Sequence, residues 1–107
     1  MGENGTNEGY IVLTLVAEPA EEGGFVSRCP ELDISSQGEH AEEAFSMLRE
    51  AIDTFISALH EIKDLDRFLK ERGIKVHRQQ PEKKSVDVAP GEIVSTLVAS
   101  VGRLIPA

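Results

Sequence analysis

The first forty residues contain short apolar runs separated by turn residues, a pattern typical of β-strands. Residues 10–17, YIVLTLVA, are β-branched or apolar at almost every position, which predicts a central strand buried on both faces. Residues 18–24 contain a proline and a Gly-Gly pair, as a hairpin loop would. Residues 25–29, FVSRC, alternate with a period of two and predict a second strand, which Pro30 ends because it has no N–H to donate. Residues 32–36 predict a short third strand, closed by Gly38.

The hydrophobic period changes from two to between three and four after residue 40, which predicts a long amphipathic helix. Its apolar positions are Ala41, Ala44, Phe45, Leu48, Ala51, Ile52, Phe55, Ile56, Leu59 and Ile62. Glu42 and Glu43 fall in the first turn, where carboxylates favour the helix dipole. A second, short helix is predicted over residues 65–72, with Asp64 as its N-cap and Gly73 as its C-terminal stop.

Two further alternating segments, residues 74–78 and 92–101, predict strands after the helices. The order β-β-β-α, short α, β-β indicates an α+β domain with a mostly antiparallel sheet covered by one long helix. A length of 107 residues, without an internal repeat, indicates a single domain. We divide it into a flexible leader at 1–9, a core at 10–78, a polar connection at 79–91 and a C-terminal strand at 92–101.

The charge of this chain is divided unevenly along its length. Residues 1–66 carry fifteen acidic and three basic side chains, a net charge of −12, whereas residues 67–107 carry four acidic and eight basic ones, a net charge of +4. An acidic surface repels the phosphates of nucleic acids and attracts a basic protein partner. A solvated acidic face that only keeps the domain soluble is the simpler interpretation of the same charges.

Candidate chemistry is sparse. Cys29 is the only cysteine, and it has no Cys-His signature around it, so we interpret it as a small core residue. Three scattered histidines lack the paired spacing of a zinc site, and neither Gly-Gly nor Gly38 continues into a phosphate-binding pattern. We therefore expect no cofactor and no metal. No apolar stretch is long enough to span a membrane and no secretory signal is visible, so we expect a cytoplasmic protein.

The segment EGGFVSRCPELDISSQGEHAEEAFSMLREAI, residues 22–52, resembles the N-terminal domain of the HicB family of antitoxins. The matching residues keep a fixed spacing over a strand, a loop and a helix: Glu22, Gly23, Gly24, Phe25, Val26, Cys29, Pro30, Glu31, Leu32, Ser36, Gln37, Gly38, Glu42, Glu43, Ala44, Leu48, Glu50, Ala51 and Ile52. Two positions depart from the family pattern. Asp33-Ile34 stands where many members have Pro-Gly, and His40 stands where a threonine often caps the helix.

This resemblance implies a partly formed ribonuclease H-like fold without nuclease activity, made of three strands, a helix and a further strand. It also implies a non-enzymatic protein that binds and neutralises HicA, a small basic toxin that cleaves messenger RNA. Many members carry a C-terminal DNA-binding segment, but no recognition helix follows Arg78, which argues against DNA binding by this chain. The predicted acidic surface suits such a basic partner.

We predict that partner contacts are made by Glu31, Asp33, Gln37, Glu42 and Glu43. A homo-oligomer, either a dimer or a tetramer, is also expected, because an edge strand such as residues 92–101 invites pairing with another chain. Two alternatives remain. The chain could be a stand-alone oligomeric HicB-like protein without a toxin, or a small nucleic-acid-processing enzyme on a ribonuclease H-like scaffold.

Overall fold

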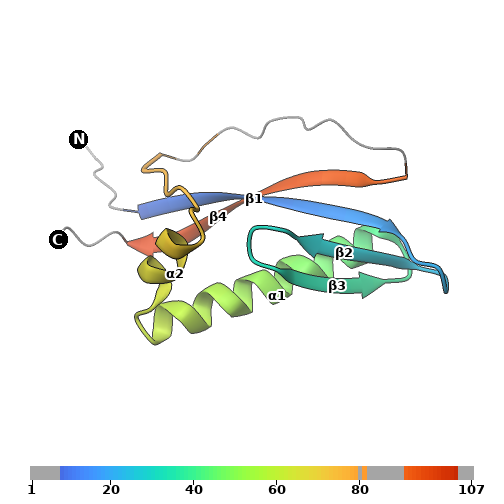
Figure 1. Cartoon of the computed structure of the whole chain (residues 1–107), viewed down its shortest axis with the longest axis horizontal. Coiled ribbons are helices and arrows are strands. Elements are labelled where there is room, and N and C mark those ends of the chain that lie inside the picture. The colour runs from blue at the N-terminus through green and yellow to red at the C-terminus, as the bar shows by residue number, and fades with distance from the viewer. Residues whose placement is uncertain (1–7, 80, 82–90, 104–107) are drawn as a thin grey trace.

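The structure, a computed structural model, describes residues 8–79, 81 and 91–103. Four strands form one antiparallel sheet in the order β3-β2-β1-β4, and a long helix lies against it (Figure 1). The elements are β1 (Glu8–Pro19), β2 (Phe25–Cys29), β3 (Ile34–Gly38), α1 (Ala41–Glu61), α2 (Leu65–Glu71) and β4 (Ile93–Arg103). This architecture confirms the predicted α+β class with an antiparallel sheet and one long helix.

The core lies between the sheet and the apolar stripe of α1. Alternate residues of β1, namely Ile11, Leu13, Leu15 and Ala17, are completely buried, and they belong to one core cluster with the buried helix residues Leu48, Ile52 and Ile56. Ser27 and Cys29 of β2 are also buried, and they lie on one face of the strand because its side chains alternate with a period of two. Burying a Leu or Ile side chain contributes roughly 1.5–3 kcal/mol, so this row of residues places α1 firmly on the sheet.

β1 is the central strand, as predicted, but it is longer than its apolar run. It pairs with β4 from Glu8 to Ala17 and with β2 from Val16 to Pro19. The predicted boundaries, a leader at residues 1–9 and a loop at residues 18–24, are wrong by two residues at each end of the strand, which is Glu8–Pro19. Pro19 is accommodated because it is the last residue of the strand, where its missing N–H removes no interior ladder bond.

The third strand begins two residues later than predicted. Leu32 and Asp33 form a turn in which both backbone N–H groups donate to the carbonyl of Cys29. Asp33 adopts a positive φ of 57°, and Leu32 turns into the core, where it is 3% exposed. In the sequence, the apolar Leu32 resembles the first buried position of an alternating strand, but the turn is what buries it. β3 therefore occupies residues 34–38 and contains Gly38.

The strand predicted over residues 74–78 is wrong. Gly73, at a φ of 68°, ends α2 as predicted, but the described residues 74–79 make only one bridge, in which His77 and Tyr10 exchange backbone hydrogen bonds of 2.7 and 2.8 Å. Farther along the same side of β1, the backbone N–H of Thr14 is bonded to Glu31, and Val16 to Pro19 pair with β2. A strand at residues 74–78 could not extend past these positions. Asp64 precedes α2 but makes no side-chain cap, because its carboxylate binds Arg67 instead.

The direction of β4 depends on where the chain re-enters the sheet. His77 bridges Tyr10 at one end of β1, whereas Ile93 pairs with Ala17 at the other end. β4 therefore runs antiparallel to β1, and it extends to Arg103 rather than to residue 101. Most of the predicted polar connection, residues 80 and 82–90, lies outside the described residues, as do residues 1–7 of the leader.

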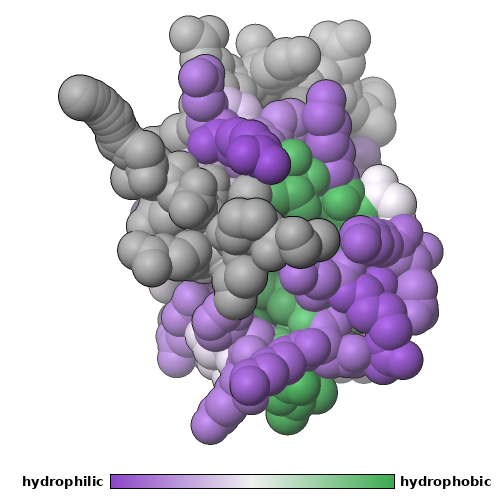
Figure 2. Space-filling model, turned by 90° about the vertical axis from the view of Figure 1, so that its left-hand side faces the viewer, coloured by the Kyte–Doolittle hydropathy of each residue, from purple (hydrophilic) through white to green (hydrophobic). Residues whose placement is uncertain are grey.

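Seen from the end near α2, hydrophilic side chains dominate the described surface, with a narrow hydrophobic strip between them (Figure 2).

Candidate functional site

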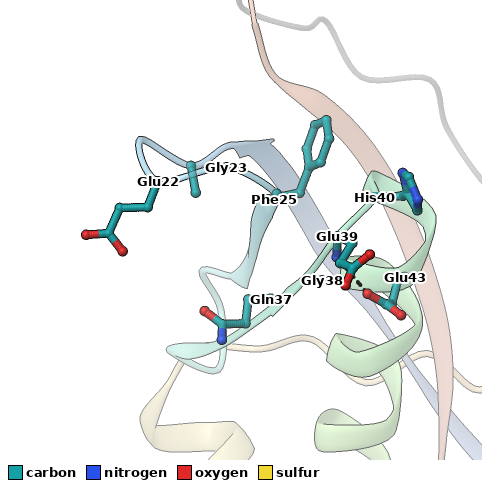
Figure 3. A pocket seen from close by; sticks show the side chains of 10 residues that line it. Glu22, Gly23, Phe25, Gln37, Gly38, Glu39, His40 and Glu43 are labelled. Carbon is teal, nitrogen blue, oxygen red and sulfur yellow. Dashed lines mark hydrogen bonds between the residues drawn. The ribbon is translucent and has the colours of Figure 1, made fainter.

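An open hollow of about 730 Å³ lies where the β1–β2 hairpin, the end of β3 and the start of α1 meet (Figure 3). It is the place at which the glycine-rich and acidic stretch noted in the sequence comes together in space. Its lining residues are Ala20, Glu22, Gly23, Gly24, Phe25, Gln37, Gly38, Glu39, His40 and Glu43. Of the lining residues that the structure describes, three are carboxylates and none is a lysine or an arginine.

Two glycines allow the walls of this hollow to approach each other. Gly24 has a φ of 75°, and a Cβ added there would lie 2.7 Å from the carbonyl oxygen of Gly38. A Cβ on Gly38 would lie 2.6 Å from the backbone nitrogen of Ala44 in the first turns of α1. Such contacts are too short for any real Cβ. Both glycines are therefore required by close packing, and together they hold hairpin, strand and helix against one another.

A buried hydrogen bond fixes the helix on the same side. The hydroxyl of Ser27, which is 0% exposed, donates to the carbonyl oxygen of Ala44 over 2.7 Å. A buried hydroxyl must have such a partner, because leaving it unpaired costs roughly 1–3 kcal/mol. The start of α1 is thus tied to β2, and the residues of its first turn are held at a defined position beside the hollow.

The carboxylates around the hollow are mostly free to meet a ligand. Glu43 is the exception, since it accepts a hydrogen bond of 2.6 Å from the backbone N–H of Glu39 and so helps to cap α1 (Figure 3). His40 is at the N-cap position and makes no side-chain cap, which agrees with the weak capping expected of histidine. The side chain of Glu22 extends outward from the hairpin tip, away from Glu43 (Figure 3).

The structure brings some of the predicted contact residues together and separates others. Gln37 and Glu43 line the hollow, and Glu42 is exposed next to Glu43 in the first turn of α1. Asp33 is exposed in the turn between β2 and β3, at the end of these strands that lies away from the hollow. The register of β2 with β3, which pairs Phe25 with Gly38, makes these two places opposite ends of one hairpin.

Glu31 has a structural role. Its two carboxylate oxygens accept hydrogen bonds from the backbone N–H of Thr14 at 3.0 Å and from the Thr14 hydroxyl at 2.7 Å. The thiol of Cys29 donates to the same carboxylate at 3.6 Å. Thr14 lies on β1 just before the part that pairs with β2, so Glu31 accepts from a backbone N–H that β2 does not reach. With both oxygens engaged inside the protein, Glu31 has little left to offer a partner.

Among the charged, aromatic and imidazole side chains of the hollow, sequence reasoning missed Glu22, Phe25, Glu39 and His40. The signal that could have found them is the pairing of the second and third strands. Once Phe25 is placed opposite Gly38, the hairpin tip must lie beside the residues just before the helix. That register depended on the start of β3, which the sequence placed two residues too early.

Cys29 does not have the environment of a reactive thiol. It is fully buried, and burial raises the pKa of its thiol to about 11, an effect strengthened by the nearby Glu31 carboxylate. A nucleophilic cysteine requires the opposite shift, because the thiolate is the reactive species. The geometry therefore fits the interpretation of Cys29 as a core residue.

Within the ranges 8–79 and 91–103, no group of three or more His, Cys, Asp or Glu side chains is placed to hold a metal ion. No helix in the described part of the chain is long and apolar enough to cross a membrane. Comparison of the chain with protein-family models, with curated proteins and with solved structures finds no significant match.

Proposed function

We propose that this chain is a HicB-like, non-enzymatic antitoxin that acts in the cytoplasm, where it binds and neutralises a small basic HicA-like toxin that cleaves messenger RNA. The observation that carries the proposal is the acidic hollow beside α1. Glu22, Glu39 and Glu43 line it, no lysine or arginine is among the described residues that line it, and Glu42 is exposed next to it. The resemblance over residues 22–52 covers the same residues.

The hollow is suited to basic side chains for electrostatic and geometric reasons. Its carboxylates attract lysine or arginine, and Gln37 adds an amide that can donate or accept a hydrogen bond. The aromatic ring of Phe25 offers a face against which a guanidinium can stack. A surface held by close-packed glycines and a buried Ser27 bond is already formed, so a partner does not have to order it on binding.

Neutralisation would follow because the acidic hollow and the RNA phosphates compete for the same basic side chains of the toxin. A ribonuclease holds the RNA backbone largely through lysine and arginine. If those side chains enter the acidic hollow, the same groups are no longer available to phosphates, and access to RNA is blocked. This mechanism requires no chemistry from the antitoxin, only a preformed acidic surface and fast association. Electrostatic steering of this kind raises association rates and weakens as salt is added.

The first experiment is an affinity purification of the tagged protein from its native host, analysed by mass spectrometry. The proposal predicts a stoichiometric small basic protein that is released by salt. Recovery of the tagged protein alone, over several growth conditions, would contradict the antitoxin function and favour the stand-alone oligomer.

The partner then allows the surface to be tested by charge reversal. The double variant Glu22→Lys/Glu42→Lys leaves the Glu43 cap intact and is expected to slow association by about tenfold at low ionic strength. A variant with the same change in charge at the far end of α1 and in α2, Glu61→Lys/Asp66→Lys, is the control and should retain most of the association rate. Equal slowing by both variants would show that only net charge matters and that the hollow is not the binding site.

A further inference from the structure

β4 presents an unusual edge of the sheet. It pairs with β1 along one side, and within the described residues no strand pairs with its outer side. Tyr10 and Thr14 direct their N–H groups to His77 and Glu31, on the side of β1 away from β4. The alternate residues of β1 must therefore bond to β4, which leaves the backbone groups of Val94, Thr96, Val98 and Ser100 directed outward.

The two edges of the sheet differ in how they are protected against pairing. β3 is only five residues long and largely polar, ISSQG, which is a usual way to protect an edge. β4 has eleven residues, and its stretch IVSTLVASVG, residues 93–102, contains no charge and no proline. A long, uncharged edge strand with alternating apolar residues is a template for another strand.

Apolar side chains beside this edge are also incompletely covered. Ile93 is 44% exposed, and Leu97 and Ala99 are only partly buried although they face α1. Two adjoining hollows of about 280 and 480 Å³ separate α1 from the second half of β4, and both are lined by Asp53, Ile56 and Ser100. A strand added to β4 would cover the outer rim of these hollows and bury more of Ile93.

We propose that the outer edge of β4 pairs with β4 of a second copy of this chain, antiparallel and about a twofold axis at Leu97. This register pairs all four outward residues with one another: Val94 with Ser100 of the other copy, and Thr96 with Val98. On the helix side, Leu97 faces its own equivalent and Ile93 faces Val101. Residues 93–102 contain no charged side chain, so no like charges oppose each other within the paired strands. The two four-stranded sheets become one continuous sheet.

Charge and area both favour a second copy as the occupant. A basic partner would gain nothing from a strand without charges, whereas two copies with a net charge of −8 each can pair along residues 93–102 without opposing like charges within the strand. A strand of this length is roughly 35 Å long at about 3.3 Å per residue, which gives an interface at the small end of the specific range. The dimer is therefore a reversible one that dissociates on dilution. Its association strengthens with salt, because salt screens the repulsion between acidic copies.

The interface is tested by placing a lysine on the edge. Thr96→Lys puts a charge at the middle of the pairing region, opposite Thr14 and with its side chain on the sheet face away from α1. It should raise the dissociation constant of the dimer by at least about tenfold in sedimentation velocity, since the twofold axis places two lysines in one interface. Ser46→Lys, on the exposed side of α1, carries the same added charge and should leave the dimer unchanged.

Backbone hydrogen exchange gives a second readout that does not depend on any variant. The amides of residues 94, 96, 98 and 100 should exchange more slowly as protein concentration rises, whereas the amides of 93, 95, 97 and 99 are already bonded to β1. A chain that stays monomeric at every concentration, a dimer that persists in Thr96→Lys, or protection of these four amides only when a different protein is added would each overturn the proposal. Because salt strengthens this association and weakens binding to a basic toxin, failure of one does not resemble failure of the other.

Discussion

Removing the carboxylate of Glu31 should destabilise the fold far more than loss of an ordinary surface glutamate. The side chain connects the turn after β2 to the centre of β1 through the N–H and the hydroxyl of Thr14. It also accepts from the Cys29 thiol, so one carboxylate serves three donors. In Glu31→Ala, the N–H of Thr14 loses its partner at a position where β2 does not reach.

The size of the effect follows from these bonds. A hydrogen bond to a charged acceptor contributes about 1.5–3 kcal/mol, and partial solvent access at Glu31 reduces this value. We expect Glu31→Ala to lower the free energy of unfolding by about 2–4 kcal/mol. Glu31→Gln keeps one acceptor for the Thr14 N–H and can donate to the Thr14 hydroxyl, so it should cost only about 1 kcal/mol.

Urea denaturation followed by far-UV circular dichroism measures these differences. A double-mutant cycle with Thr14→Val, which removes the hydroxyl but keeps the N–H, should give a coupling energy of about 1 kcal/mol. A loss below about 0.5 kcal/mol in Glu31→Ala, the range of ordinary surface substitutions, would refute the reasoning. The same variants distinguish a structural role of Glu31 from a role in partner binding, because Glu31→Gln should leave the association rate with a basic partner unchanged.

Two further predictions concern close packing and the buried thiol. Gly38→Ala should lower the free energy of unfolding by about 1–3 kcal/mol, because its Cβ would meet the backbone of Ala44 at 2.6 Å; wild-type stability by urea denaturation would contradict the close approach of β3 and α1. The folded pKa of Cys29 is about 11 against 9.0 for the free group. Its stabilising contribution is therefore complete below pH 9 and is lost between pH 9 and 11, because the unfolded chain releases the proton first. The difference in unfolding free energy between wild type and Cys29→Ala should shrink over this range by an amount on the order of 2 kcal/mol, and a constant difference would contradict the raised pKa.

The acidic hollow shows where prediction of a site from sequence stops. The sequence predicts Gln37, Glu42 and Glu43 as partner contacts. Gln37 lies just before a clearly amphipathic helix, and the two glutamates lie in its first turn. Glu22 and Glu39 join them only through the register of β2 with β3, and Glu31 leaves the set only because Thr14 lies within hydrogen-bond distance. Chemical type and sequence spacing identify carboxylates, but they do not distinguish one that is bonded internally from one that is free.

What the sequence determined by itself is the set of elements. Period-two alternation over residues 25–29 and the apolar stripe of α1 specify local conformation and a buried face, because both depend on neighbours within a few residues. The tertiary structure decided the rest. It shifted β3 by two residues around the turn at Asp33, reduced residues 74–78 to one bridge at Tyr10, and set β4 antiparallel at the edge of the sheet. The β3 shift depends on the turn that buries Leu32, and the other two outcomes depend on which backbone groups of β1 are already occupied by distant residues. Strand pairing is a competition for hydrogen-bonding positions, and its outcome is settled only when the whole sheet is assembled.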